Sequence, residues 1–123
     1  MDHAASNHAS EVVALLCPEL RLNRLLRMAL EADGFGVRDW PLTQRPASHG
    51  VRAIVADLDS LGWSPDSADE GLAAIGFPTD VARLLISVLP SETVHRGASN
   101  VAYLQPPFSP REFVRGLHTL LNL

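Results

Sequence analysis

The 123-residue sequence predicts an α/β fold, a three-layer α/β/α sandwich built on a five-stranded parallel sheet. Apolar, strand-like runs alternate with helix-like segments five times, which is the order of a sheet with helical crossovers. Several of these runs are continuously apolar, as strands are when both sheet faces are covered. The size suits one domain, so we expect a flexible tail over residues 1–10 and a single domain over 11–123.

The first half of the chain contains three expected strands and one long helix. Residues 11–17 predict a buried strand, and a helix follows from Pro18, a residue that suits the first helical position. Residues 35–42 predict a strand at the sheet edge, because proline in a strand favours an edge. Residues 51–59 form the clearest strand. The buried face of the helix is expected to consist of Leu22, Leu25, Leu26, Ala29 and Leu30.

Two of the expected helices are short. Only residues 43–50 separate the second strand from the third, fewer than a crossover normally needs, so the second helix is reduced to a turn. Residues 60–67 read as a turn-rich segment. Residues 68–76 predict a short helix, and residues 90–100 allow at most two helical turns, so the fourth helix is also short.

The remaining segments of the second half are two strands and the last helix. Strands are expected over residues 82–89 and 101–105. The last helix carries a full start signal, with Ser109 as cap, Pro110 in first position and Glu112 closing a capping box.

Composition excludes several classes of function. The net charge is −4, and the ten basic residues, all arginine, are spread along the chain, which argues against a nucleic-acid surface. No apolar run reaches the length of a membrane span, and the N-terminal residues do not read as a secretory signal. Cys17 is the only cysteine, which favours a reducing compartment. We therefore expect a cytoplasmic protein.

Polar residues follow the strands at the edge where parallel sheets carry their sites. Asp57 and Asp59 end the third strand, Ser87 ends the fourth, and Cys17 ends the first. For Cys17 the alternatives are a redox thiol at a helix start and a buried small hydrophobe, and the second is favoured. Glu19 could reach a metal, but a glutamate in a first helical turn more often complements the helix dipole.

These residues resemble the receiver domain of bacterial response regulators. The resemblance is carried by Asp57 after an apolar strand, Ser87 ending the next, "YLQPPF" over 103–108 and "ADGF" over 32–35. It implies a flavodoxin-like strand order and makes Asp57 the phosphoacceptor position. It implies that Ser87 and Tyr103 are switch residues and that the Pro106–Pro107 bond is cis. Asp59 would contribute a backbone carbonyl, with its side chain solvated.

Three positions depart from the pattern that the resemblance implies. The acidic pair that would hold magnesium falls on Cys17 and Pro18, and the lysine that would contact the phosphoryl group falls on Pro106. Neither a proline nor a cysteine sulfur suits Mg²⁺, which prefers oxygen ligands. The chain contains no lysine at all. We expect no metal, no cofactor and no normal phosphoryl transfer, since that chemistry depends on positioned charge.

The expected function is therefore that of a degenerate, stand-alone receiver in two-component signalling, not an enzyme. It would act by binding a protein partner, with a homodimer as one form of that contact, through a surface carrying Arg96, Arg111 and Arg115. One alternative is a competent receiver that binds Mg²⁺ and is phosphorylated on Asp57. A second is a small aspartate phosphatase, since "VADLDSLG" resembles the first motif of the haloacid-dehalogenase family.

Two further residue types receive an interpretation from the sequence. The histidines, His118 among them, show no ligand spacing and are read as surface residues. Trp40 and Trp63 are read as ordinary packing near the sheet edges.

Overall fold

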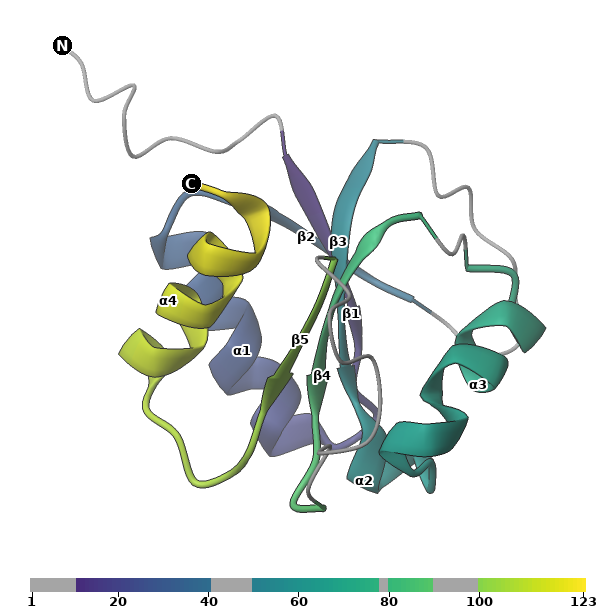
Figure 1. Cartoon of the computed structure of the whole chain (residues 1–123). Helices are drawn as coiled ribbons and strands as arrows, with labels where there is room; N and C mark the ends of the chain where they lie inside the picture. The colour runs from purple at the N-terminus through teal and green to yellow at the C-terminus, as the bar shows by residue number, and fades with distance from the viewer. Residues whose placement is uncertain (1–10, 41–49, 78–79, 90–99) are drawn as a thin grey trace, which may run out of the picture.

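The computed structural model describes residues 11–40, 50–77, 80–89 and 100–123, and they form one five-stranded sheet with helices on both faces (Figure 1). All neighbouring strands are parallel, in the order β2-β1-β3-β4-β5. This confirms the expected three-layer sandwich and its flavodoxin-like order, with β2 at an edge. The strands are β1 Val12–Leu16, β2 Gly36–Asp39, β3 Val51–Asp57, β4 Ala82–Ile86 and β5 Val101–Leu104.

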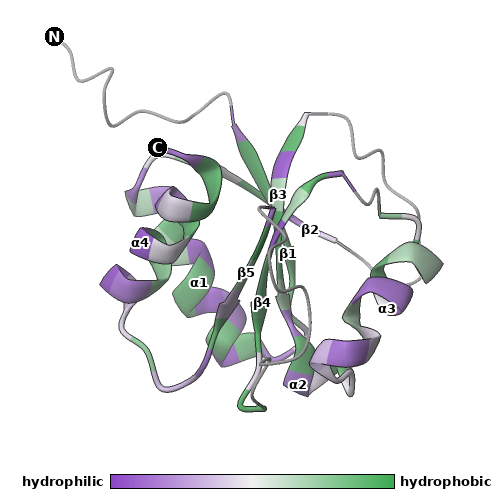
Figure 2. Ribbon diagram, viewed as in Figure 1, coloured by the Kyte–Doolittle hydropathy of each residue, from purple (hydrophilic) through white to green (hydrophobic). Residues whose placement is uncertain are grey.

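Alternation along the strands divides the core into two halves. In β1, Val13 and Leu15 join the core beneath α1 and α4, whereas Ala14 and Leu16 join the core beneath α2 and α3. Figure 2 shows the central strands as mostly hydrophobic along their length. Because both faces of the central strands are covered, these strands are mostly apolar in the sequence, whereas β2 at the edge is not.

Helix α1, Leu20–Ala32, starts two residues later than the sequence predicted. Pro18 precedes the helix, and Glu19 caps it by accepting hydrogen bonds from the backbone N–H groups of Arg21 and Leu22. The carboxylate thus satisfies two amides that would lack intrahelical partners. Leu25 was expected to be buried, but it is 57% exposed, because the helix turns Leu26 and Leu30 toward the sheet instead.

The segment after β3 contains more helix than was expected. A short helix, α2 Leu58–Leu61, begins directly after Asp57. Its first half was expected to be the end of the strand over 51–59, which stops at Asp57, and its second half was expected to be a turn. It ends at Gly62, whose φ of 74° is a left-handed conformation that glycine adopts without strain. A 3-10 turn, Pro65–Ser67, then leads into α3, Ala68–Ala74, close to the expected helix.

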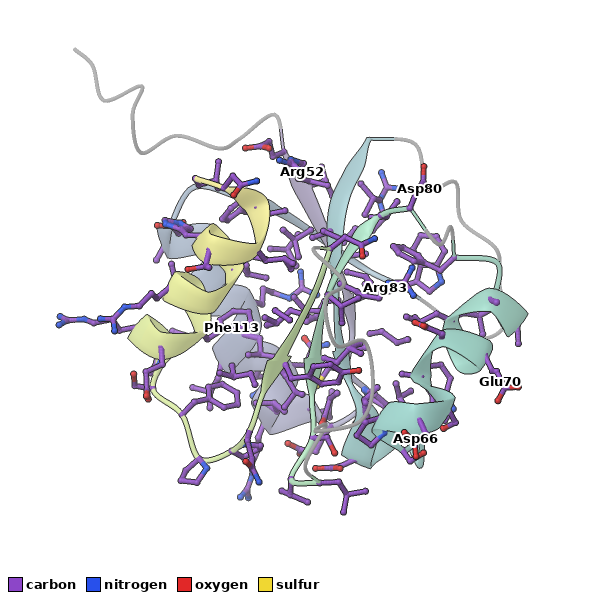
Figure 3. All side chains as sticks on the ribbon, in the orientation of Figure 1. Arg52, Asp66, Glu70, Asp80, Arg83 and Phe113 are labelled. Atoms are coloured by element: carbon purple, nitrogen blue, oxygen red, sulfur yellow. The ribbon has the colours of Figure 1, made fainter. Side chains whose placement is uncertain are left out.

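Helix α4, Pro110–Leu121, confirms the expected start signal. Ser109 accepts from the Glu112 amide at 3.1 Å, while the Glu112 carboxylate accepts from the Ser109 amide at 2.8 Å. Phe113 points from α4 into the core against the sheet (Figure 3). Helices α1 and α4 therefore lie side by side on one face, and α2 and α3 cover the other (Figure 1).

Some of the expected elements lie outside the described residues. The tail over 1–10, the reduced second helix over 43–50 and most of the short fourth helix over 90–100 belong to this group. Within the part of the chain that the structure describes, no helix combines the length and apolarity needed to cross a membrane.

Candidate functional site

The sheet register brings three of the expected site residues to one edge. Leu16 pairs with Ala56, and Asp57 pairs with Ile86. Cys17, Asp57 and Ser87 therefore emerge together where β1, β3 and β4 end, and all three are buried. In an open parallel sheet this is the edge where ligands bind.

Cys17 contacts Asp57 directly. Its Sγ lies 3.9 Å from Asp57 Oδ2 and 3.6 Å from the carbonyl oxygen of Glu19, so the thiol is within donating distance of both. Burial, followed by the charge of Asp57, raises the pKa of the Cys17 thiol to about 12. The thiol is thus neutral at physiological pH. This is the opposite of the activated thiolate that a redox role requires, and it agrees with the interpretation of Cys17 as a small buried residue.

The same environment acts on Asp57. Desolvation by burial raises the pKa of Asp57 above its usual range, and the nearby carboxylates of Asp59 and Glu19 act in the same direction. A hydrogen bond from Ser60 lowers it in part. The carboxyl is thereby shifted toward its neutral form, which is a poorer nucleophile and a poorer metal ligand than a carboxylate.

Asp59 does not have the solvated side chain that was expected. Its Oδ1 accepts from the Ser87 hydroxyl at 3.0 Å, and its Oδ2 accepts from the Val88 amide at 2.9 Å. The Ser87 oxygen in turn accepts from the Leu89 amide at 3.1 Å. Because α2 begins immediately after β3, Asp59 faces the end of β4 and holds the Ser87 hydroxyl in one orientation. We call this Asp59–Ser87–Val88 arrangement the β4 clamp.

The residues of β5 lie beside this clamp. Gln105 donates to the Val88 carbonyl at 2.8 Å and so ties the end of β5 to the end of β4. Tyr103 pairs in register with Leu85, is half-buried and packs against the α2–α3 side of the core. Burial, with the charges of Asp69 and Asp66, raises its pKa to about 12. The Pro106–Pro107 bond is cis, which confirms that prediction.

The residues around Asp57 do not fit a magnesium ion. The Cys17 sulfur, which lies 3.9 Å from Asp57 Oδ2, is a soft atom and a poor ligand for Mg²⁺, and Pro18 offers no side-chain ligand. Among the described residues, no three or more His, Cys, Asp or Glu side chains converge in a group that could hold a metal. The residues present therefore do not support chemistry through such an ion.

The three arginines expected on the partner surface are only partly described. Arg111 and Arg115 are exposed on α4, where they line a groove shared with α1. Arg96 lies outside the described residues.

Among the charged contacts that the sequence did not predict are those of Arg83 and His118. Arg83 on β4 is buried between the sheet and α3 (Figure 3), where its guanidinium forms a 2.7 Å ion pair with Asp69. His118, expected at the surface, is half-buried and lies 2.5 Å from Asp33 at the end of α1. An arginine inside an apolar strand gives a weak sequence signal for a buried pair, because its partner must come from another element.

The comparisons with known proteins concern the fold. No family model matches the sequence, and no curated protein matches it. A crystal structure of a response regulator from Thermotoga maritima is similar, with a TM-score of 0.62 and 12% sequence identity, over 94% of this chain and 100% of that chain. A likeness at this identity shows the fold alone: the chain has a receiver-like fold.

Proposed function

We propose that the chain is a degenerate receiver that acts in signal transduction by binding a protein partner, without aspartyl phosphorylation. The observation that carries this proposal is the surroundings of Asp57. A neutral thiol occupies the first-strand position, the lysine position holds Pro106, and the carboxylates near Asp57 raise its pKa further. Phosphoryl transfer depends almost wholly on charge stabilisation of the kind that a metal ion and a lysine would supply.

The β4 clamp supports the same proposal. A switch hydroxyl has to be available to a phosphoryl group on Asp57, but the Ser87 hydroxyl already donates to Asp59. The clamp also bears on the phosphatase alternative, which needs Asp59 as the acid. Both oxygens of Asp59 accept hydrogen bonds from Ser87 and Val88, the two residues that follow β4, so this carboxylate already has a structural role.

Restoring the missing groups tests the proposal. The variant Cys17→Asp/Pro18→Asp/Pro106→Lys supplies two hard oxygen ligands and a mobile cation beside Asp57. We expect this variant to bind Mg²⁺, measured by calorimetry, and to gain one phosphoryl group from an acyl phosphate, measured by intact mass.

The control adds Asp57→Asn to the triple variant and should abolish the gain in mass. If a well-folded triple variant binds no Mg²⁺ and stays unlabelled, these three positions are not what separates the chain from a working receiver. Circular dichroism establishes folding, because replacing Pro18 and Pro106 changes the loops on either side of the site.

A further inference from the structure

We propose that the groove between α1 and α4 binds an acidic amphipathic helix of a partner protein. This inference rests on the proposed function, which calls for a protein partner, and it names the chemistry by which that partner is recognised. Three features of the groove support this inference. They are two arginines without an ion-pair partner among the described residues, which we call the basic wall, a floor of small residues, and an apolar pocket at one end.

The basic wall belongs to α4. Arg111 and Arg115 line a groove of about 670 Å³ and lie one helical turn apart on the same side of the helix. Neither guanidinium has an ion-pair partner among the described residues. The carboxylate of Asp33, which also lines the groove, is engaged by His118, and that of Glu112 closes the capping box. The groove therefore exposes two positive charges with which carboxylates of a partner can form ion pairs.

The floor of the groove belongs to α1. Ala29 and Ala32 line it on that side, and Val114 lines it on the α4 side. Small side chains leave room for a third element to approach closely, as helices do when they pack 8–10 Å apart. The lining runs from Pro110 to Leu123, the whole length of α4, which is about 18 Å at 1.5 Å per residue. A length of this order suits a helix of three turns.

An apolar pocket continues the groove at the start of α4. This second cavity of about 230 Å³ shares Ala29 and Pro110 with the first, so the two are contiguous. Leu25, Pro107 and Phe108 are among its walls, and Leu25 is 57% exposed. The pocket and this exposed leucine together form an apolar surface that a partner can cover. A partner that fills the groove therefore needs a large apolar side chain at this end.

The spacing of the charges favours a helix. Arg111 and Arg115 are separated by about 6 Å along the axis of α4, the rise of four helical residues. Two carboxylates spaced i, i+4 on a neighbouring helix match this distance, and an apolar residue one turn away reaches the pocket. Nucleic acid fits less well, because it would leave the apolar pocket unused and it needs more cations than two.

A second copy of the chain offers only part of this pattern. Asp66 and Glu70 are exposed, spaced by four, and lie on the opposite side of the molecule from α4 (Figure 3). Between Asp66 and Phe77, however, no large apolar side chain is exposed to enter the pocket. The acidic segment of another protein is the occupant that satisfies all three features.

A charge-swap experiment tests this inference. The probes are two fluorescein-labelled helical peptides, one with a leucine and two glutamates spaced i, i+4, the other with lysines in place of the glutamates. With the full chain at low salt and no phosphodonor, fluorescence anisotropy should show binding of the acidic peptide and at least about tenfold weaker binding of the basic one. Added salt should weaken binding of the acidic peptide.

Variants locate the contact. The variant Arg111→Glu/Arg115→Glu should no longer bind the acidic peptide and should bind the basic one. The control Arg21→Glu/Arg24→Glu makes an equal change in net charge outside the groove and should change the affinity for either peptide by no more than about twofold. Ala32→Trp should weaken binding of the acidic peptide, because the larger side chain occupies space in the groove without changing any charge. Circular dichroism checks that each variant is folded.

Three results would overturn the inference. They are no binding of the acidic peptide below about 1 mM, the same loss of acidic-peptide affinity in both double arginine variants, and equal affinity of the wild-type chain for the two peptides. Sedimentation velocity without peptide supplies a fourth: self-association that Arg111→Glu/Arg115→Glu abolishes would make the second copy the occupant. Because no phosphodonor is present, these results are independent of Asp57. Phosphorylation of Asp57 would contradict the proposed function and leave peptide binding in the groove intact.

Discussion

Asp57 lies at the end of a buried strand, against a neutral thiol and near two further carboxylates. Its raised pKa means that the folded protein holds a proton more tightly at this position than the unfolded chain does. The folded state consequently loses stability as the pH rises from the ordinary aspartate value of 3.8 through the raised value. Above the raised pKa, Asp57 is ionised in both states, and the free energy of unfolding is lowered by the whole cost of burying that charge.

Asp57→Asn should therefore stabilise the protein at pH 7 and have little effect below pH 3.8, where the carboxyl is protonated in both states. The amide keeps the size of the side chain and can still accept from Cys17. Thermal unfolding from pH 3 to pH 8 measures the difference. A variant that is less stable than wild type by the same amount at every pH would show that burial does not oppose the charge of Asp57.

At the scale of single elements, α3 depends on a contact with an aromatic ring. A Cβ added at Gly71 would lie 2.7 Å from Trp63 Cε2, closer than a packed carbon tolerates. Glycine inside a helix is otherwise unfavourable by about 1 kcal/mol relative to alanine. Gly71 is thus best explained by the indole that covers it.

Gly71→Ala should destabilise the protein by about 1 kcal/mol, since overpacking of about 1–3 kcal/mol outweighs the gain in helix propensity. In a Trp63→Ala background the same substitution should stabilise by about 1 kcal/mol, because only the propensity gain remains. Urea unfolding of the four proteins measures the coupling. Equal effects of Gly71→Ala in both backgrounds would contradict the packing of the Trp63 indole on Gly71.

The elements that the sequence predicts well are those whose signals are local. The capping box of Ser109 and Glu112 lies within four residues, and the central strands appear as mostly apolar runs. The start of α1 was misjudged because Pro18 suits a first helical position, whereas a side-chain contact of Glu19 fixes the actual start. Helix α2 was missed because a single turn of helix before Gly62 has almost the same sequence signal as a loop.

Contacts between distant residues could not be predicted in the same way. Asp59 and Ser87 are 28 residues apart, and His118 and Asp33 are 85 apart. The first pair depends on the register of the sheet, and the second depends on the packing of α1 against α4. Neither leaves a trace in local composition. The resemblance placed Asp57 and Ser87 at one edge, but the hydrogen bond that holds the Ser87 hydroxyl appears only in the structure.

For the whole molecule, charge is divided between the two helical layers. Helices α1 and α4 carry Arg21, Arg24, Arg27, Arg111 and Arg115, half of the ten arginines. Residues 58–77, which contain α2 and α3, carry four carboxylates and no basic residue. The sheet therefore separates a basic face from an acidic face, and this separation favours partners of opposite charge at each face.

The fold and the chemistry of the site can thus be considered separately. The receiver-like topology is kept, with Asp57 and Ser87 at the edge where such sheets bind ligands. Under the proposed function, Cys17, Pro18 and Pro106 occupy the positions of the groups that would make Asp57 reactive. Under the proposed function, the chain keeps the shape of a receiver and works through its surfaces.

Intact-mass spectrometry of the wild-type chain, after incubation with an acyl phosphate and Mg²⁺, decides whether Asp57 is inactive. We expect no mass increase at neutral pH, under conditions that label an ordinary receiver in the same tube. Wild-type protein that gains the mass of one phosphoryl group, and loses that gain in Asp57→Asn, would refute the proposed function and establish Asp57 as a working acceptor.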